Sequence, residues 1–377
     1  MQHIFRIGIS GSYGGMNLGD EAILAAIVSQ LRESLPVEIT VFSRNPKDTL
    51  KRHDVERAIP AREMTRKEVT PEIQRLDLFI IGGGGIFFDR LTEMFLREVF
   101  IAQEIGVPVA VYAVGAGPLT RQSARDALRR AMNSVDILTV RDRQASRLLE
   151  EIGVSREIHL TADPALILNH VEVQLDRVKA EGVDFDRPLV GFSVREPGPA
   201  APDIDPEEYY RLLANAADYI VERLEAEVVF VPMERTDIQH GHAVVARMYN
   251  ASRAAVLRRE YSSQEILGLL GHFEFAVGMR LHFLIFAALR RVPFTALPYA
   301  SKVTGFLQDL GKEVSPLGRV GVGQLIARID RSWDTRKEMS KRITARLPRL
   351  QERARETNRL VVELLKMRAA VQGRKAA

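Results

Sequence analysis

The 377-residue sequence contains no cysteine, and this absence removes several kinds of chemistry at once. Disulfide bonds, thiolate nucleophiles and cysteine-ligated zinc sites are all excluded. The sequence also lacks an apolar run long enough to cross a bilayer, and its first residues enter an expected strand without the apolar segment of a signal peptide. We therefore expect a soluble cytoplasmic protein.

A strong charge of either sign is missing as well. The formal net charge is only +4, and no basic stripe with interleaved aromatic residues is present, so the sequence does not indicate a nucleic-acid-binding protein. A content of 46% hydrophobic and 27% charged residues is ordinary for a globular enzyme. Because 377 residues exceed what one hydrophobic core usually supports, we expect two domains.

Two nucleotide-binding motifs are also absent. The glycines Gly8, Gly11 and Gly14 after the first expected strand do not have the G-x-G-x-x-G spacing of a dinucleotide-binding loop. The Gly-Lys-Ser/Thr ending of a P-loop is missing too. The sequence therefore predicts neither of these phosphate sites.

Short apolar runs alternate with helical segments along most of the chain. The expected strands cover residues 4–10, 37–42, 76–81, 108–114, 137–140, 189–194, 228–231, 255–257, 273–277 and 293–297. This alternation predicts parallel sheets covered by helices, with ligands at the carboxyl ends of the strands. A polar stretch at 171–187 is the expected linker, which gives domains at 1–178 and 187–333 and a helical segment at 334–377.

The segment 278–302 brings charged side chains to one sheet edge. It starts at the glycine that ends a strand, and Arg280 and His282 then precede an alanine-rich helix; the next strand leads into a loop that ends at Lys302. A basic first turn opposes the usual preference for carboxylates, and helix N-termini bind anions. We therefore predict an anion site. The alternative is that Arg280 pairs with a structural carboxylate and His282 is a core histidine.

Glycine-rich loops follow two strands of the first half. In the first loop, Asn17 and Asp20 lie just before a helix expected at 21–35, and Asp20 fits either a helix N-cap or a ligand contact. The second is the run of four glycines that contains Gly83 and Gly84. Such a run marks the close approach of a ligand or of another backbone, and tight packing between the domains remains the alternative.

The loops resemble one family in both content and order. The segments GSYGGMNLGDEAIL, DLFIIGGGGIFFD, VYAVGAGPL, VRDRQAS, TADPAL and GMRLHFLIFAALRRVPFTALPYASKVTGF resemble the polysaccharide pyruvyl transferase family, over about residues 7 to 311. The likeness is greatest to the bacterial ketal-pyruvyl transferases that modify secondary cell-wall polymers. It implies a GT-B-like α/β fold, in which two Rossmann-type domains with parallel sheets face each other and a C-terminal helix crosses the junction.

The resemblance also implies an activity, the transfer of the enolpyruvyl unit of phosphoenolpyruvate to a sugar of a cell-surface polysaccharide precursor. The product is a pyruvate ketal, and phosphate is released. The first domain is then the acceptor side and the second the phosphoenolpyruvate side. We hypothesise that His282 is the general acid and that Asp20 helps to deprotonate the acceptor hydroxyl. The predicted substrate-binding residues are Arg141, Arg280, Lys302, Asn17, Gly83, Gly84 and Arg195.

No cofactor or metal is expected, because these cations already neutralise the phosphate and the sequence suggests no convergent carboxylate cluster. The acceptor is expected to be a glycan, either lipid-linked or nucleotide-linked. The basic helix expected at 334–368 fits a structural helix across the domain junction or a peripheral contact with the inner face of the cytoplasmic membrane.

Two other functions remain open. One is a GT-B glycosyltransferase, in which Glu234 or Asp237 binds the ribose of a sugar nucleotide. The other is a non-catalytic protein that binds a phospho-ligand or a glycan.

Overall fold

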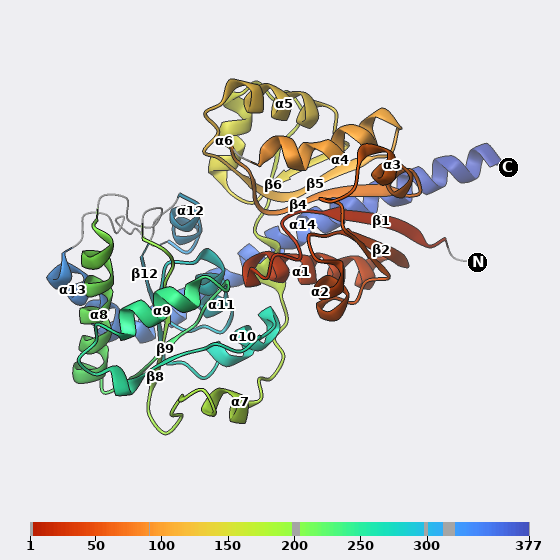
Figure 1. Ribbon diagram of the computed structural model, residues 1–377. Helices are drawn as coiled ribbons and strands as arrows, with labels where there is room; N and C mark the ends of the chain where they lie inside the picture. Colours follow the sequence, from red (N-terminus) through yellow and green to blue (C-terminus); the bar gives the residue numbers. More distant parts are fainter. Residues whose placement is uncertain (1–2, 90, 198–203, 298–300, 312–320, 377) are drawn as a thin grey trace. The chain divides into compact units, whose positions relative to one another are not determined.

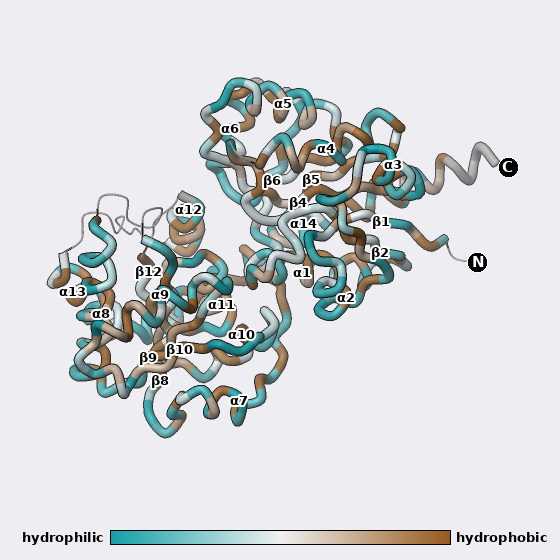
Figure 2. The backbone as a smooth tube through the Cα atoms, viewed as in Figure 1, coloured by the Kyte–Doolittle hydropathy of each residue, from teal (hydrophilic) through white to brown (hydrophobic). Residues whose placement is uncertain are grey.

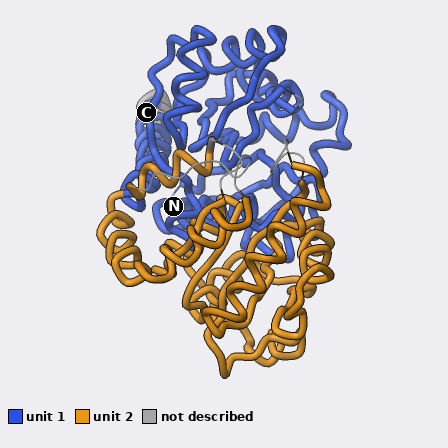
Figure 3. Tube along the Cα trace, turned by 90° about the vertical axis from the view of Figure 1, so that its left-hand side faces the viewer, with its two compact units in different colours: residues 1–168, 350–377 blue, residues 169–349 orange. Residues whose placement is uncertain are grey.

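A computed structural model describes residues 3–89, 91–197, 204–297, 301–311 and 321–376 (Figure 1). The chain forms two compact units, coloured separately in Figure 3. Unit 1 contains residues 1–168 and 350–377, and unit 2 contains residues 169–349.

Unit 1 is built on a seven-stranded parallel sheet with the order β3-β2-β1-β4-β5-β6-β7. Its strands are β1 (Phe5–Ser10), β2 (Val37–Phe42), β3 (Arg57–Ile59), β4 (Leu78–Phe87), β5 (Val109–Ala116), β6 (Ile137–Val140) and β7 (His159–Leu160). Its helices are α1 (Leu18–Ser34), α2 (Pro46–Arg52), α3 (Arg66–Gln74), α4 (Thr92–Glu104), α5 (Gln122–Asn133), α6 (Arg143–Glu151) and the 3-10 turn η1 (Pro164–Ile167). Brown, hydrophobic segments lie around β5 in Figure 2, and almost every residue of the central strands β4 and β5 is buried, as expected for strands covered on both faces.

Unit 2 has a five-stranded parallel sheet with the order β10-β9-β8-β11-β12. Its strands are β8 (Leu189–Ser193), β9 (Glu227–Phe230), β10 (Ala254–Val256), β11 (Phe275–Gly278) and β12 (Phe294–Ala296). Its helices are α7 (Leu175–Lys179), α8 (Pro206–Arg223), α9 (Asp237–Val245), η2 (Ala251–Arg253), α10 (Ser263–Leu270), α11 (Leu281–Leu289), α12 (Ser301–Asp309) and α13 (Val322–Asp334). The predicted α/β class with two parallel sheets is confirmed.

The last helix, α14 (Arg336–Ala376), contributes its first part to unit 2 and its second part to unit 1. Its apolar positions Ile343, Leu347, Leu350, Val361 and Leu365 are all buried, which supports its structural role. In unit 1 the helix also buries Thr357, and the hydroxyl of this residue lies 3.0 Å from the Thr139 hydroxyl. None of the described helices is long and apolar enough to span a membrane.

Two expected boundaries lie elsewhere in the structure. The units divide after Leu168, and the polar segment expected as a linker from residue 171 belongs to unit 2. It is attached there because the Val171 N–H donates to the Gln264 carbonyl at 3.1 Å. Strand β4 also continues through the glycine run instead of ending before it, since Gly82 and Gly84 pair with residues of β5.

Candidate functional site

The N-terminus of α1 forms one edge of the site in unit 1. The helix begins at Leu18, three residues earlier than expected, because the Asn17 side chain is the N-cap. Its carbonyl oxygen accepts hydrogen bonds from the N–H groups of Gly19 at 3.0 Å and Asp20 at 3.3 Å. The N-cap role considered for Asp20 is therefore wrong, and Asp20 lies in the first turn of the helix. The capping role of Asn17 is established, whereas its contact with substrate stays a prediction.

Buried polar contacts fix the loop between β1 and α1. The Tyr13 hydroxyl donates to the Gly82 carbonyl of β4. Burial, and then the negative charges of Asp20 and Glu21, hold the pKa of Tyr13 well above its usual value. The Glu21 carboxylate accepts from the Gly14 N–H at 2.9 Å and lies 2.7 Å from the His53 imidazole. The loop is thus held to the sheet by groups to which the sequence analysis gave no role.

The glycine run of β4 lies directly against α1. Gly83 and Gly84 have φ values of +71° and +80°, which L side chains rarely adopt. A Cβ atom on Gly84 would lie 3.0 Å from Oδ1 of Asp20, and one on Gly83 would lie 2.0 Å from Cγ2 of Ile23. The structure therefore brings Asp20 and Gly84 together. The close packing around these glycines lies within unit 1, and the expected alternative of packing between domains is not needed to explain it.

Arg141 follows β6 and is almost completely buried. Its Nη1 donates to Oδ2 of Asp163 at 2.6 Å, and its guanidinium covers Gly115, where a Cβ atom would lie 3.0 Å from Nε. Asp163 was not predicted as a site residue, although it stands after a strand in the segment TADPAL. Its carboxylate compensates the charge of Arg141, while donor binding by Arg141 stays a prediction.

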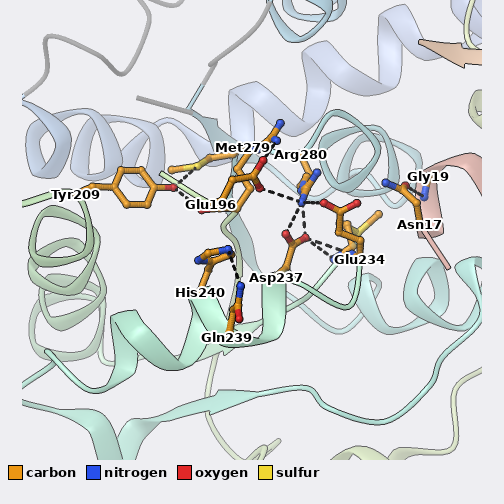
Figure 4. Close-up of polar contacts among 12 residues, drawn as sticks. Asn17, Gly19, Glu196, Tyr209, Glu234, Asp237, Gln239, His240, Met279 and Arg280 are labelled. Atoms are coloured by element: carbon orange, nitrogen blue, oxygen red, sulfur yellow. Dashed lines mark hydrogen bonds and ion pairs between the residues drawn. The ribbon is translucent and has the colours of Figure 1, made fainter. Parts of the chain in front are cut away.

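In unit 2, Arg280 precedes α11 as its N-cap residue and contacts several carboxylates (Figure 4). Its Nε donates to Oδ2 of Asp237 at 3.1 Å, and its Nη2 donates to Oδ1 of the same residue and to Oε1 of Glu234. Nη2 also lies 3.8 Å from Glu196. The alternative stated for Arg280, an ion pair with structural carboxylates, is thus what the structure contains. Its direct contact with a substrate stays a prediction.

Asp237 is the most buried member of this cluster. Its Oδ2 also accepts hydrogen bonds from the N–H groups of Met233 at 3.1 Å and Glu234 at 3.2 Å. Burial raises the pKa of the Asp237 carboxyl to about 6, although Arg280 acts in the opposite direction. Glu234 and Asp237, the two carboxylates that would bind the ribose in a glycosyltransferase, therefore both accept hydrogen bonds from Arg280.

Oxygen atoms of Glu196, Glu234 and Asp237 all lie within 4.8 Å of one another, a grouping that could hold a metal ion. The expectation that no carboxylates converge was wrong, because Glu196 from the loop after β8 meets Glu234 and Asp237, which lie between the end of β9 and the first residue of α9. However, the Arg280 guanidinium lies among these oxygens and supplies the positive charge that a cation would bring.

The remaining predicted residues of unit 2 lie at helix starts and strand ends. His282 is half-buried in the first turn of α11. Lys302 is half-buried in the first turn of α12, not in a loop as expected, while residues 298–300 of the predicted loop lie outside the described part of the chain. Arg195 follows β8 and pairs with Glu196. His282, Lys302 and Arg195 thus follow the carboxyl ends of β11, β12 and β8, as predicted. Their contacts with substrate stay predictions.

A second histidine lies beside the Arg280 cluster. His240 of α9 is buried, and its Nδ1 lies 2.7 Å from the Tyr210 hydroxyl. Burial lowers its pKa. Its location one helical turn after Asp237 could have suggested this position, because residues three apart share a helix face.

Solved structures with the same fold come from proteins of several activities. UDP-GlcNAc 2-epimerase from Neisseria meningitidis has a TM-score of 0.64 at 9% identity, with 97% of this chain and 100% of that chain covered. The enzyme of the same name from Methanocaldococcus jannaschii has a TM-score of 0.60 at 14% identity, with 87% of this chain and 92% of that chain covered. The N-terminal domain of Candida albicans trehalose-6-phosphate phosphatase has a TM-score of 0.57 at 10% identity, covering 97% of each chain. At these identities the likeness shows the fold alone, which is the predicted GT-B fold.

The family itself is shown by sequence. No curated protein matches the chain. The family model of polysaccharide pyruvyl transferases matches residues 17–301, a range that includes the start of α1, the glycine run, Arg141 and the Arg280–His282 segment. The chain therefore belongs to the polysaccharide pyruvyl transferase family and is a transferase.

Proposed function

We propose that the protein transfers the enolpyruvyl unit of phosphoenolpyruvate to a sugar of a cell-surface polysaccharide precursor, forming a pyruvate ketal and releasing phosphate. The observation that carries the proposal is the position of His282 in the first turn of α11, next to Arg280, which the buried Asp237 carboxylate holds in place. Histidine side chains are common general acids in enzymes, and the helix N-terminus favours an anionic donor.

Phosphoenolpyruvate carries both a carboxylate and a phosphate, so its site needs more than one positive group. Arg195 and Arg280 each contact carboxylates, and Arg280 does not cap α11 with its side chain. We assign the donor to Lys302, a cation in the first turn of α12, and to the first-turn N–H groups of α11. Arg280 fixes the start of this helix, and with it the position of His282.

The reaction begins with proton transfer from the His282 imidazolium to the methylene carbon of the donor, which becomes a methyl group. A sugar hydroxyl attacks the resulting oxocarbenium-like carbon and gives up its proton to a base. The C–O bond to phosphate then breaks, and phosphate leaves with its electron pair. A second hydroxyl of the same sugar attacks the same carbon and loses its proton, which closes the cyclic ketal.

The acceptor is assigned to the edge of unit 1 at the start of α1, where Asp20 lies. Asp20 lies against the backbone at Gly84, where glycine leaves room that a side chain would fill. Carboxylates bind sugar hydroxyls through hydrogen bonds and can accept a proton from one of them. Asp20 is therefore the proposed general base.

The proposal is tested with phosphoenolpyruvate labelled with ¹³C at its central carbon and a panel of lipid-linked and nucleotide-linked amino sugars. The expected product has this carbon in a ketal, which NMR distinguishes from free pyruvate. Saturable binding and turnover of a sugar nucleotide without consumption of phosphoenolpyruvate would instead identify a glycosyltransferase. Binding of phosphoenolpyruvate or glycan without turnover of either would identify a non-catalytic binding protein.

A further inference from the structure

The first part of α14, residues 336–349, is strongly basic. This segment of unit 2 contains six arginine or lysine residues and a single acid, Glu338. The next 21 residues of the helix, 350–370, are more balanced, with five basic and three acidic residues. The excess of positive charge is therefore confined to the start of the helix.

The helix is fixed so that one side of this segment faces solvent. Met339, Ile343 and Leu347 are buried on the inner side. The Ser340 hydroxyl donates to the Arg291 carbonyl at 2.9 Å, which attaches the helix to the turn before β12. The exposed basic residues, which we call the basic face, are Lys337, Lys341, Arg342, Arg346 and Arg349. The packed helix thus places five cations on the surface of unit 2.

The basic face differs from the rest of the helix in how its charges are compensated. In the second part of α14, Arg359 pairs with Glu356 at 2.6 Å, and Arg368 pairs with Asp136 at 3.3 Å. By contrast, no residue of the basic face forms an ion pair with an acid in the described ranges of the chain. Uncompensated like charges repel one another, so an external anionic surface would relieve this repulsion.

We propose that the basic face binds an anionic lipid surface. The uncharged outward positions of the segment are Thr344, Ala345 and Pro348, which offer no large apolar group for insertion into the bilayer. The contact is therefore electrostatic, of the kind made by surface lysines and arginines with anionic headgroups. The segment has no aromatic residue on which nucleic-acid bases could stack, so its chemistry favours lipid over nucleic acid. This inference extends the proposed function, because it brings the enzyme to the surface that would carry a lipid-linked acceptor.

The test is co-sedimentation of the full chain with vesicles, which needs no catalytic turnover. We expect binding to vesicles of phosphatidylglycerol and phosphatidylcholine at low salt, little binding to phosphatidylcholine alone, and release at high salt. Each cation near an anionic surface is worth roughly a fivefold change in binding. The triple variant Lys337→Ser, Lys341→Ser, Arg342→Ser should therefore lose affinity by roughly a hundredfold.

A matched control removes three other exposed cations of the same unit, in the variant Lys179→Ser, Arg258→Ser, Arg259→Ser. The control has the same net charge as the test variant and should bind vesicles nearly as well as the wild type. Equal losses in the two variants, no loss in the test variant, or binding of a short DNA duplex in preference to vesicles would overturn the proposal. Turnover with a lipid-free acceptor, measured in parallel, tests the proposed function separately and should be the same in all three proteins.

Discussion

Arg280 and Asp237 form a buried, bidentate ion pair. Nε of Arg280 donates to Oδ2 of Asp237 at 3.1 Å, Nη2 donates to Oδ1, and the Asp237 side chain is only 1% exposed. The pair connects the N-cap residue of α11 with the first residue of α9. The position of the Arg280–His282 segment is thus set by a carboxylate 43 residues earlier in the chain.

Removing the guanidinium should destabilise unit 2. In Arg280→Met, a buried carboxylate loses its partner, which typically costs about 3–5 kcal/mol. Arg280→Lys retains the charge but loses the bidentate geometry, so we expect a smaller loss. Urea denaturation followed by the fluorescence of Trp333, the single tryptophan, which packs on Phe275 of unit 2, measures both effects. Equal stability of Arg280→Met and the wild type would show that the pair does not hold α11.

The titration of Asp237 gives the stability of unit 2 a specific pH dependence. The folded-state pKa of about 6 lies above the usual value of 3.8, so the folded state retains a proton that the unfolded state has lost between these values. This contribution to stability is present at low pH and is lost as the pH rises through about 6. Asparagine does not titrate, so the stability of Asp237→Asn relative to the wild type should increase as the pH rises from 4 to 7. Urea midpoints measured across this range test the increase. A difference in unfolding free energy between Asp237→Asn and the wild type that stays constant from pH 4 to 7 would contradict the raised pKa of Asp237.

Sequence reasoning predicted the strands and the starts of the charged segments, because short apolar runs that end in glycine are a local signal. It did not predict that Glu196, Glu234 and Asp237 converge on Arg280. That convergence depends on the sheet order β9-β8-β11, which places the loops after these strands side by side, and no local pattern encodes this order. The predicted end of β4 was wrong for a related reason: a run of glycines is typical of a loop, but Gly82 and Gly84 pair with β5.

The glycine run offers a matched pair of substitutions. Gly83→Ala places a Cβ atom 2.0 Å from Ile23 at a φ of +71°, so we expect a loss of about 2 kcal/mol or more. Gly85→Ala meets its nearest atom, Nη2 of Arg141, at 3.6 Å, and should change stability by less than about 1 kcal/mol. Thermal unfolding followed by circular dichroism compares the two variants. Similar melting temperatures would contradict the packing of β4 against α1.

Turnover should not depend on a divalent cation. The carboxylates that could bind one already contact the Arg280 guanidinium, and the proposed donor site uses Lys302 and helix N–H groups for charge compensation. We expect the same rate after treatment with a chelator and after addition of Mg²⁺ or Mn²⁺. Loss of turnover with the chelator and its recovery with a metal would contradict a donor site in which Lys302 and helix N–H groups alone compensate the charge of phosphoenolpyruvate.

The central claim is tested most directly by phosphate release from phosphoenolpyruvate, measured with and without a sugar acceptor, for the wild type and for His282→Ala. The wild type should release phosphate only with an acceptor, and the variant should be at least about a hundredfold slower with an unchanged melting temperature. A folded His282→Ala variant that retains near-normal acceptor-dependent release would contradict the role of His282 as the general acid.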